Sequence, residues 1–177
     1  QSYEQMVLVV SGNYGQEALS VDPITIDPAV SEPETQQILS IVTPVTPQRY
    51  WDGPFRLPVA EDDRDCVKGW FGTRRDYNAG SYFSFHAGLD YGICSETHPY
   101  DIYAPAPGVV VFVGKLTVRG NATVIDHGWG IYSGYWHQAE SYIAVGDMVT
   151  TGQLIGKIGG TGRVTGPHLH WEIWVNG

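Results

Sequence analysis

The sequence is poor in cysteine and in basic residues, and it lacks any long hydrophobic run. Ten lysines and arginines stand against nineteen aspartates and glutamates, which gives a net charge of −9 at pH 7. Nucleic-acid-binding proteins normally carry a basic patch, so this balance argues against nucleic acid as a partner. No run of about 18 apolar residues occurs, so we predict no transmembrane segment in this chain.

Only two cysteines are present, Cys66 and Cys94. Two free thiols are common in a cytosolic protein, whereas a disulfide is expected only in an oxidising compartment, so the cysteines alone leave their state open. The chain begins at Gln1 without a signal-peptide pattern and ends just after a strand-like run. We therefore expect that its N-terminus arises by processing or by design of the expressed chain, and that its C-terminus is truncated.

Helical periodicity is also missing between residues 100 and 177. Short apolar runs alternate there with glycine-rich turn signals, as in "GVVVFVG", "NATVIDHG", "GIYSGYWH", "QLIGKIGG" and "HLHWEIWV". This spacing is typical of an all-β domain. We predict a mostly β fold whose principal domain spans residues 58–177.

Residues 1–57 differ in composition from the rest of the chain. The runs "MVLVVSG" and "ALSVDPITI" predict short strands, and a Pro/Thr/Glu-rich stretch comes after them. The residues Ser31 to Thr35 favour the start of a brief helix over "TQQILSIV", which Pro44 and Pro47 would end. We interpret this segment as the tail of a preceding β module plus a linker.

The chemistry-bearing residues are histidines. His168 and His170 in "TGPHLHWEIW" are one residue apart in an expected strand and point to the same face. Such a pair is either polar surface or part of a site that holds a metal or a substrate. In "FHAGLDYG", His86 and Asp90 share a face in the same way, with Gly88 between them leaving room for an ion or a substrate backbone. Taken alone, a surface His and Asp around a glycine turn explain this segment equally well.

The two segments together suggest a metal site. Catalytic zinc usually takes three protein ligands and keeps a fourth position open, which His86, Asp90 and one member of the histidine pair would satisfy. His137, at the end of the strand "GIYSGYWH", is a candidate neighbour of that site. Glu172 lies on the same face as the pair by parity, either as an acceptor that orients an imidazole N–H or as a plain strand carboxylate.

Other polar and aromatic side chains are weaker candidates. Arg74 and Arg75 would either contact substrate carboxylates or simply solvate their loop. Several aromatic residues are interpreted as either groove lining or ordinary packing: Tyr82, Trp129, Tyr132, Tyr135 and Trp136.

These motifs carry a family resemblance. In this order, "HAGLD", "YWH" and "TGPHLHWE" resemble the lysostaphin-type zinc endopeptidases, also called the LytM type. "WFGTRRDYNAG" is similar to the FG-x-R segment of that family, and "APAPGVVVFVG" to its A-x-x-G-x-V strand. The resemblance covers roughly residues 54–174. It implies an antiparallel β-sheet groove domain of the duplicated hybrid motif kind.

Residue by residue, the resemblance implies Zn²⁺ bound by His86, Asp90 and His170, with His137 and His168 as catalytic histidines that do not bind the metal. All five positions hold the expected residue types. Degenerate members of the family lose ligands and act as activators of other hydrolases, and no ligand is lost here. The implied substrate is the peptide part of bacterial peptidoglycan. An extracytoplasmic location follows from that substrate, and with it a Cys66–Cys94 disulfide becomes the expected state.

We therefore expect a zinc endopeptidase that hydrolyses cross-links or stem peptides of peptidoglycan. Two alternatives stay open from the sequence: a non-catalytic or self-occluded wall-binding or activator module of the same fold, and a zinc peptidase acting on protein substrates. The sequence does not distinguish which peptide bond is cut or how His137 and His168 divide their roles.

Overall fold

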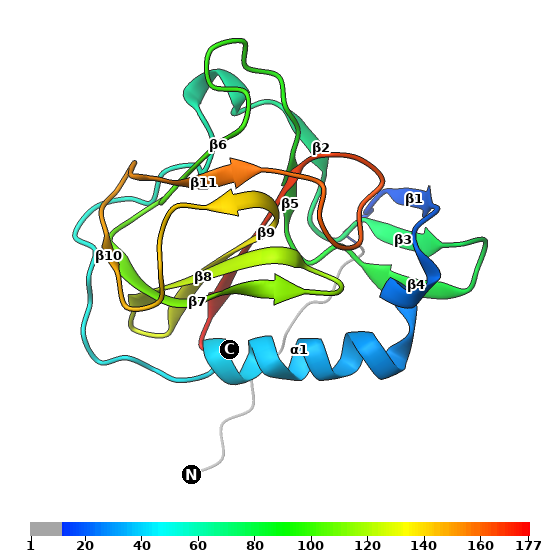
Figure 1. Ribbon diagram of the computed structural model, residues 1–177, viewed down its shortest axis with the longest axis horizontal. Helices are drawn as coiled ribbons and strands as arrows, with labels where there is room; N and C mark the ends of the chain where they lie inside the picture. The colour runs from blue at the N-terminus through cyan, green and yellow to red at the C-terminus, as the bar shows by residue number, and fades with distance from the viewer. Residues whose placement is uncertain (1–11) are drawn as a thin grey trace.

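The computed structural model describes residues 12–177. In this described part, one large sheet dominates, with a small sheet beside it and a single long helix beneath it (Figure 1). The mostly β expectation is confirmed. The strand expected over "MVLVVSG" falls almost wholly on residues outside the described part of the chain.

The large sheet has nine strands among residues 12–177. Along its main path the strand order is β10-β7-β8-β9-β12-β5-β2, and β11 connects β9 to β6. All its pairings are antiparallel. Its strands are β2 (Val67–Gly69), β5 (Leu89–Tyr91), β6 (Asp101–Tyr103), β7 (Gly108–Leu116), β8 (Gly120–Gly128), β9 (Ile131–Ser141), β10 (Met148–Val149), β11 (Leu154–Ile158) and β12 (Leu169–Val175).

The small sheet has the order β1-β3-β4. Its strands are β1 (Gln16–Leu19), β3 (Arg74–Tyr77) and β4 (Tyr82–Phe85). β1 pairs with β3 in parallel, so the segment before the helix adds an edge strand to a hairpin of the principal domain. Part of the run "ALSVDPITI" is not a strand, because Asp22 and Pro23 begin a 3-10 turn, η1 (Pro23–Ile26), in which the Asp22 carboxylate accepts from the Ile24 N–H at 3.1 Å. A second short turn, η2, spans Glu61–Asp63.

The helix α1 (Pro28–Val42) is longer than the brief helix expected from Ser31 onward. Its start is set upstream: Asp27 caps the Ala29 N–H at 2.9 Å and Pro28 occupies the first turn, where its missing N–H costs nothing. Pro33 lies inside the helix without ending it. Within the described residues, no helix is long and apolar enough to cross a membrane.

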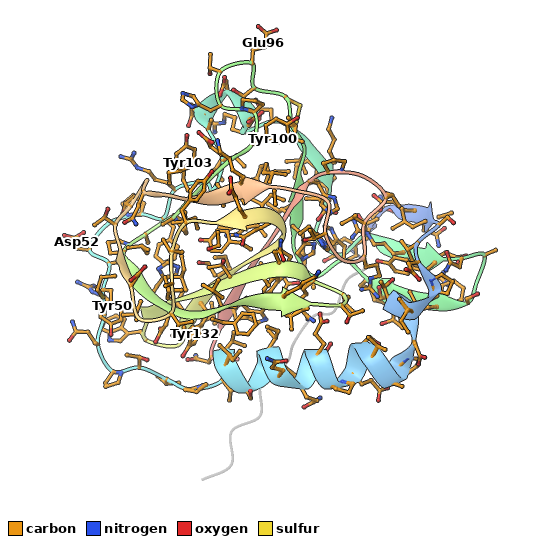
Figure 2. All side chains as sticks on the ribbon, in the orientation of Figure 1. Tyr50, Asp52, Glu96, Tyr100, Tyr103 and Tyr132 are labelled. Carbon is orange, nitrogen blue, oxygen red and sulfur yellow. A yellow bond between two sulfur atoms is a disulfide. The ribbon has the colours of Figure 1, made fainter. Side chains whose placement is uncertain are left out.

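Two hydrophobic clusters lie on opposite faces of the large sheet, because successive strand side chains alternate. On β8, Val124 packs toward Ile38 and Val42 of α1, while Ile125 belongs to the cluster on the other face. Tyr132, labelled in Figure 2, is buried in the cluster between α1 and the sheet, and its hydroxyl donates to the Pro44 carbonyl at 2.6 Å. The helix therefore covers one face of the sheet.

Side-chain bonds fasten α1 to the sheet. Glu34 is buried and accepts from the backbone N–H groups of Val118 and Arg119 at 2.8 and 2.9 Å, and from the Arg119 guanidinium at 3.1 Å. Val118 and Arg119 form the turn between β7 and β8. The division of the chain at residue 57 stays a prediction, but residues 16–42 are packed and bonded against the β domain.

A disulfide joins Cys66 to Cys94, with their Cα atoms 6.0 Å apart. It ties the residue before β2 to the loop after β5. Asp63 accepts from the backbone N–H of Cys94 at 3.0 Å and also bonds Ser95, so the loop is held at its base. This cross-link ties the edge strand β2 to the chain that follows β5, and Asp90 lies on β5. The loop beyond it extends to Glu96, at the top of the view in Figure 2.

Candidate metal centre

His86, Asp90 and His170 come together as buried neighbours. His86 directly follows β4, Asp90 is the central residue of β5, and His170 lies opposite Asp90 in the β5–β12 pairing. The His86 Nε2 atom is 2.9 Å from His170 Nδ1 and 3.0 Å from Asp90 Oδ1, and the latter two atoms are 2.8 Å apart. Three possible metal-ligand atoms, two imidazole nitrogens and one carboxylate oxygen, thus lie within 3.0 Å of one another.

The outer nitrogen of each ligand histidine has an acceptor of its own. His86 Nδ1 lies 2.9 Å from the Trp70 carbonyl, and His170 Nε2 lies 2.8 Å from a Glu172 carboxylate oxygen. Because a carbonyl or carboxylate oxygen only accepts, these nitrogens carry the N–H. With both rings neutral around a bound metal, the inner nitrogens would turn their lone pairs toward the ion, together with the Asp90 carboxylate. Such a cluster needs a positive charge, either a proton on His170 or a metal ion, and its ligand atoms and burial fit Zn²⁺.

The pKa shifts of His170 and Asp90 also indicate that the cluster favours a positive charge. Burial disfavours the imidazolium of His170, but the hydrogen bonds to Asp90 and Glu172 outweigh it and raise the pKa of His170 to about 9. Burial also opposes ionisation of Asp90, yet its bonds to His170 and His86 hold the pKa of this carboxyl well below its usual range. The site stabilises a carboxylate and a cationic partner together.

A second chain of contacts leads away from Asp90. Its Oδ2 accepts from the Arg75 guanidinium at 2.5 Å, and Arg75 Nε also donates to Glu17 of β1 at 3.1 Å. Arg75 does not merely solvate a loop, because it is ion-paired within the protein, and a contact of this groove-lining residue with substrate stays a prediction. Arg74 points elsewhere and lies over the Phe83 ring at 5.0 Å. Sequence reasoning missed Glu17, because a carboxylate in an edge strand carries no motif.

His137 and His168 lie beside this cluster. Their ring centroids are 4.8 Å apart, and the His137 ring lies 6.1 Å from that of His170. His137 Nδ1 donates to the Thr161 carbonyl and His168 Nδ1 to the Gly166 carbonyl, both at 2.8 Å. Both rings are thus fixed in the tautomer whose Nε2 carries a lone pair, and that of His168 lies 3.6 Å from Asp90 Oδ1.

Burial lowers the pKa of both of these histidines, most strongly that of His137. They are neutral imidazoles at neutral pH. His137 also has a φ of 64°, a left-handed conformation rare for a residue other than glycine. The local twist of β9 sets the direction of this ring, which strand alternation alone does not predict.

A groove of about 750 Å³ contains these five residues. Residues before and within α1 line one side of it, among them Glu17, Val21 and Thr35. Of the aromatic candidates, Tyr82 and Trp136 line the groove, whereas Tyr132 and Tyr135 are core residues. Trp129 is exposed and does not belong to the groove lining.

The structure also places Glu172 on β12 and Gly88 in the bend just before β5. Glu172 is the acceptor that orients an imidazole N–H, that of His170. Gly88 does not leave open space for a ligand: a Cβ there would overlap the Trp171 carbonyl and approach the Glu172–His170 pair. The glycine therefore allows the close approach of β12 to the ligand segment.

Comparison with known proteins gives consistent matches. The sequence profile described as Peptidase family M23 matches residues 84–177. The chain is 36% identical over 122 residues to the peptidoglycan DD-endopeptidase ShyA of Vibrio cholerae, which is 69% of this chain and 27% of that protein. It is 41% identical over 92 residues to the DD-carboxypeptidase/endopeptidase Mpg of Neisseria meningitidis, which is 52% of this chain and 20% of that protein.

Among solved structures, a zinc-containing peptidase from Vibrio cholerae aligns with a TM-score of 0.62 and 30% identity, over 71% of this chain and 38% of the other. The chain thus spans about a quarter of the length of the curated relatives that it matches.

Proposed function

Because this chain belongs to peptidase family M23, we propose that it is a zinc-dependent endopeptidase that hydrolyses cross-links or stem peptides of bacterial peptidoglycan. Membership confirms the family resemblance of the sequence and its groove-type β fold. The observation that carries the proposal is the convergence of three buried ligand atoms beside two neutral histidines in one groove.

We assign zinc to His86 Nε2, Asp90 and His170 Nδ1, the atoms that converge in the structure. A zinc ion supplies Lewis acidity, which polarises a carbonyl and makes water a nucleophile at neutral pH. Trp70 and Glu172 fix the two imidazoles through their outer nitrogens. Such outer contacts set the tautomer and orientation of a ligand and raise its basicity.

His137 and His168 handle the protons in this proposal. Each presents a free Nε2 lone pair, and burial keeps each ring neutral. One of them accepts a proton from the attacking water, and the imidazolium formed in this way stabilises the oxyanion or passes that proton to the leaving amine. The names of the relatives point to a DD bond as the first candidate for cleavage. A peptidoglycan substrate also implies an extracytoplasmic location in a bacterium.

The test is a digest of purified peptidoglycan followed by mass spectrometry of the fragments, with and without a chelator. Walls with glycine bridges, walls with direct diamino-acid cross-links and an ordinary polypeptide are compared. We expect chelator-sensitive cleavage of a wall peptide and none of the polypeptide. Zinc binding without any cleavage would favour the non-catalytic or occluded alternative, and cleavage of the polypeptide would favour a general protein peptidase.

Three variants separate the roles of the histidines. His170→Ala is expected to lose both zinc and activity, whereas His137→Ala and His168→Ala keep zinc and lose about 100-fold or more in kcat. His98→Ala is the matched control, because His98 has an exposed side chain outside the groove lining. It is expected to retain full activity.

A further inference from the structure

The groove is lined by side chains of both signs, and its carboxylates are those of Glu17, Glu32, Asp90 and Glu172. Four of the ten basic residues of the chain line it: Lys68, Arg75, Arg119 and Arg163. Two of these charges are already neutralised, since Arg75 pairs with Asp90 and Glu17, and Arg119 pairs with Glu34. Lys68 and Arg163 form no ion pair with any carboxylate among residues 12–177.

Arg163 is the more rigidly held of the two. Its guanidinium lies 4.8 Å from the centroid of the Tyr77 ring and 5.7 Å from that of Tyr82. One N–H donates to the Thr25 carbonyl at 3.3 Å, and the Arg163 backbone N–H donates to the Val118 carbonyl at 2.8 Å. The side chain is therefore fixed between the small sheet, the turn η1 and the β7–β8 turn before any ligand arrives.

This arrangement leaves most of the guanidinium donors available. A guanidinium has five N–H donors in a planar fork, and the structure shows one of them in a hydrogen bond. Stacking on aromatic rings occupies a face of the plane and leaves its edge for hydrogen bonds. A carboxylate is the group that matches such an edge, through two parallel N–H···O bonds. Lys68 is exposed and offers no such fork.

Arg163 also lies in the loop that carries the proposed catalytic machinery. Thr161, two residues earlier, accepts the His137 N–H, and His168 follows five residues later. Arg163 and both histidines line the same groove. A substrate carboxylate bound at Arg163 would therefore be fixed relative to the histidines that act on the scissile bond.

We propose that Arg163 is a specificity-determining residue that binds a free carboxylate of the peptide substrate. The proposal rests on the proposed function. Peptidoglycan peptides bring such carboxylates at their C-terminus and on their acidic and diamino-acid residues. Amidation of the bound carboxylate removes the charge and replaces an acceptor oxygen by a donor NH₂. This NH₂ group cannot accept a hydrogen bond from the N–H donors of Arg163.

The experiment measures kcat/KM of the zinc-loaded chain on defined cross-linked peptides in which each carboxylate is amidated in turn. We expect that amidation of one of these carboxylates, the one that Arg163 binds, lowers kcat/KM of the wild type by roughly 10- to 100-fold. This is the usual contribution of a hydrogen bond to a charged group. Arg163→Gln is expected to lose that factor on the acid substrate and to cleave acid and amide equally well. Arg163→Lys, which keeps the charge without the fork, should show an intermediate preference.

Two variants serve as controls. Arg64→Gln removes an exposed arginine outside the groove lining, and Lys68→Gln removes the other unpaired cation of the groove. Both are expected to keep the acid preference of the wild type. Activity on the amide substrate, which does not use the contact, reports on folding of each variant.

The outcomes are separable. A wild type that cleaves acid and amide substrates equally at every position overturns the role of Arg163 while leaving the proposed function intact. The same holds if Arg163→Gln keeps the preference or if Lys68→Gln abolishes it. If Arg163→Gln fails to fold, the wild type and Arg163→Lys still decide the question. If the zinc-loaded wild type cleaves neither substrate, the proposed function itself fails.

Discussion

His127 provides a test of the structural reasoning that is independent of the metal centre. Its side chain is fully buried, its Nδ1 donates to the Pro107 carbonyl at 2.8 Å, and its Nε2 accepts from the Ser133 hydroxyl at 2.7 Å. The Phe55 ring lies against it with centroids 4.9 Å apart. Burial lowers the pKa of His127 from 6.5 to about 4, more than its contacts with Pro107 and Asp126 restore.

The consequence for stability follows from linkage. Above pH 6.5 the imidazole is neutral in both the folded and the unfolded chain, so its full contribution to stability is present. Between pH 6.5 and 4 the imidazole is protonated in the unfolded chain but not in the folded protein. The free energy of unfolding therefore falls as the pH falls. With these two pKa values the loss from this one residue is about 2 kcal/mol at pH 5 and about 3 kcal/mol at pH 4.

The assay compares urea unfolding of the wild type and of His127→Gln from pH 7.5 to pH 4. Glutamine can donate to Pro107 and accept from Ser133, but it does not titrate. Other acid-sensitive groups, such as Asp90, act in both proteins and cancel in the comparison. We expect the variant to be less stable at pH 7.5 but to lose about 2 kcal/mol less than the wild type by pH 5. Parallel pH profiles would refute the assignment of His127 as a buried neutral histidine.

Three further predictions concern the groove and its support. Glu172→Gln removes the charge that faces the outer nitrogen of His170, so zinc should bind about 10- to 100-fold more weakly in a chelator competition. Gly88→Ala forces a methyl group against β12 and should lower the free energy of unfolding by about 2 kcal/mol in urea, whereas Gly53→Ala, where a Cβ meets nothing within 4 Å, should leave it nearly unchanged. Glu34→Ala leaves two buried backbone N–H groups and a guanidinium without their carboxylate, and calorimetry should show a loss of about 3 kcal/mol.

Strand alternation and motif order carry much of the prediction. His168, His170 and Glu172 share a face because a strand has a period of two, and antiparallel pairing then places His170 opposite Asp90. These are local properties, which a sequence displays directly. The all-β class is predicted for the same reason, from alternating runs and turn residues.

The features that escaped prediction depend on contacts between distant segments. No pattern in the neighbouring sequence predicts that Glu17 bonds Arg75, 58 positions away, or that Glu34 bonds a turn 84 positions away. The role of Gly88 was also misjudged, since the neighbour that excludes a side chain there belongs to β12. The start of α1 is a different case: the Asp27–Pro28 signal is local, but the expected helix was placed from Ser31 to Thr35 onward.

The chain from Glu17 through Arg75 to Asp90 links the segment before α1 to the proposed metal centre. Arg75 is 12% exposed in its side chain and lies between two carboxylates, so removing Glu17 would leave its charge facing Asp90 alone. The Asp90 carboxylate would then be drawn more fully toward Arg75 and would be less available to a cation. Because β1 also forms the parallel edge beside β3, residues 16–19 support the position of Arg75 as well as its charge. The segment therefore takes part in the proposed site, and a β domain cut at residue 57 would carry a different environment around the Asp90 carboxylate.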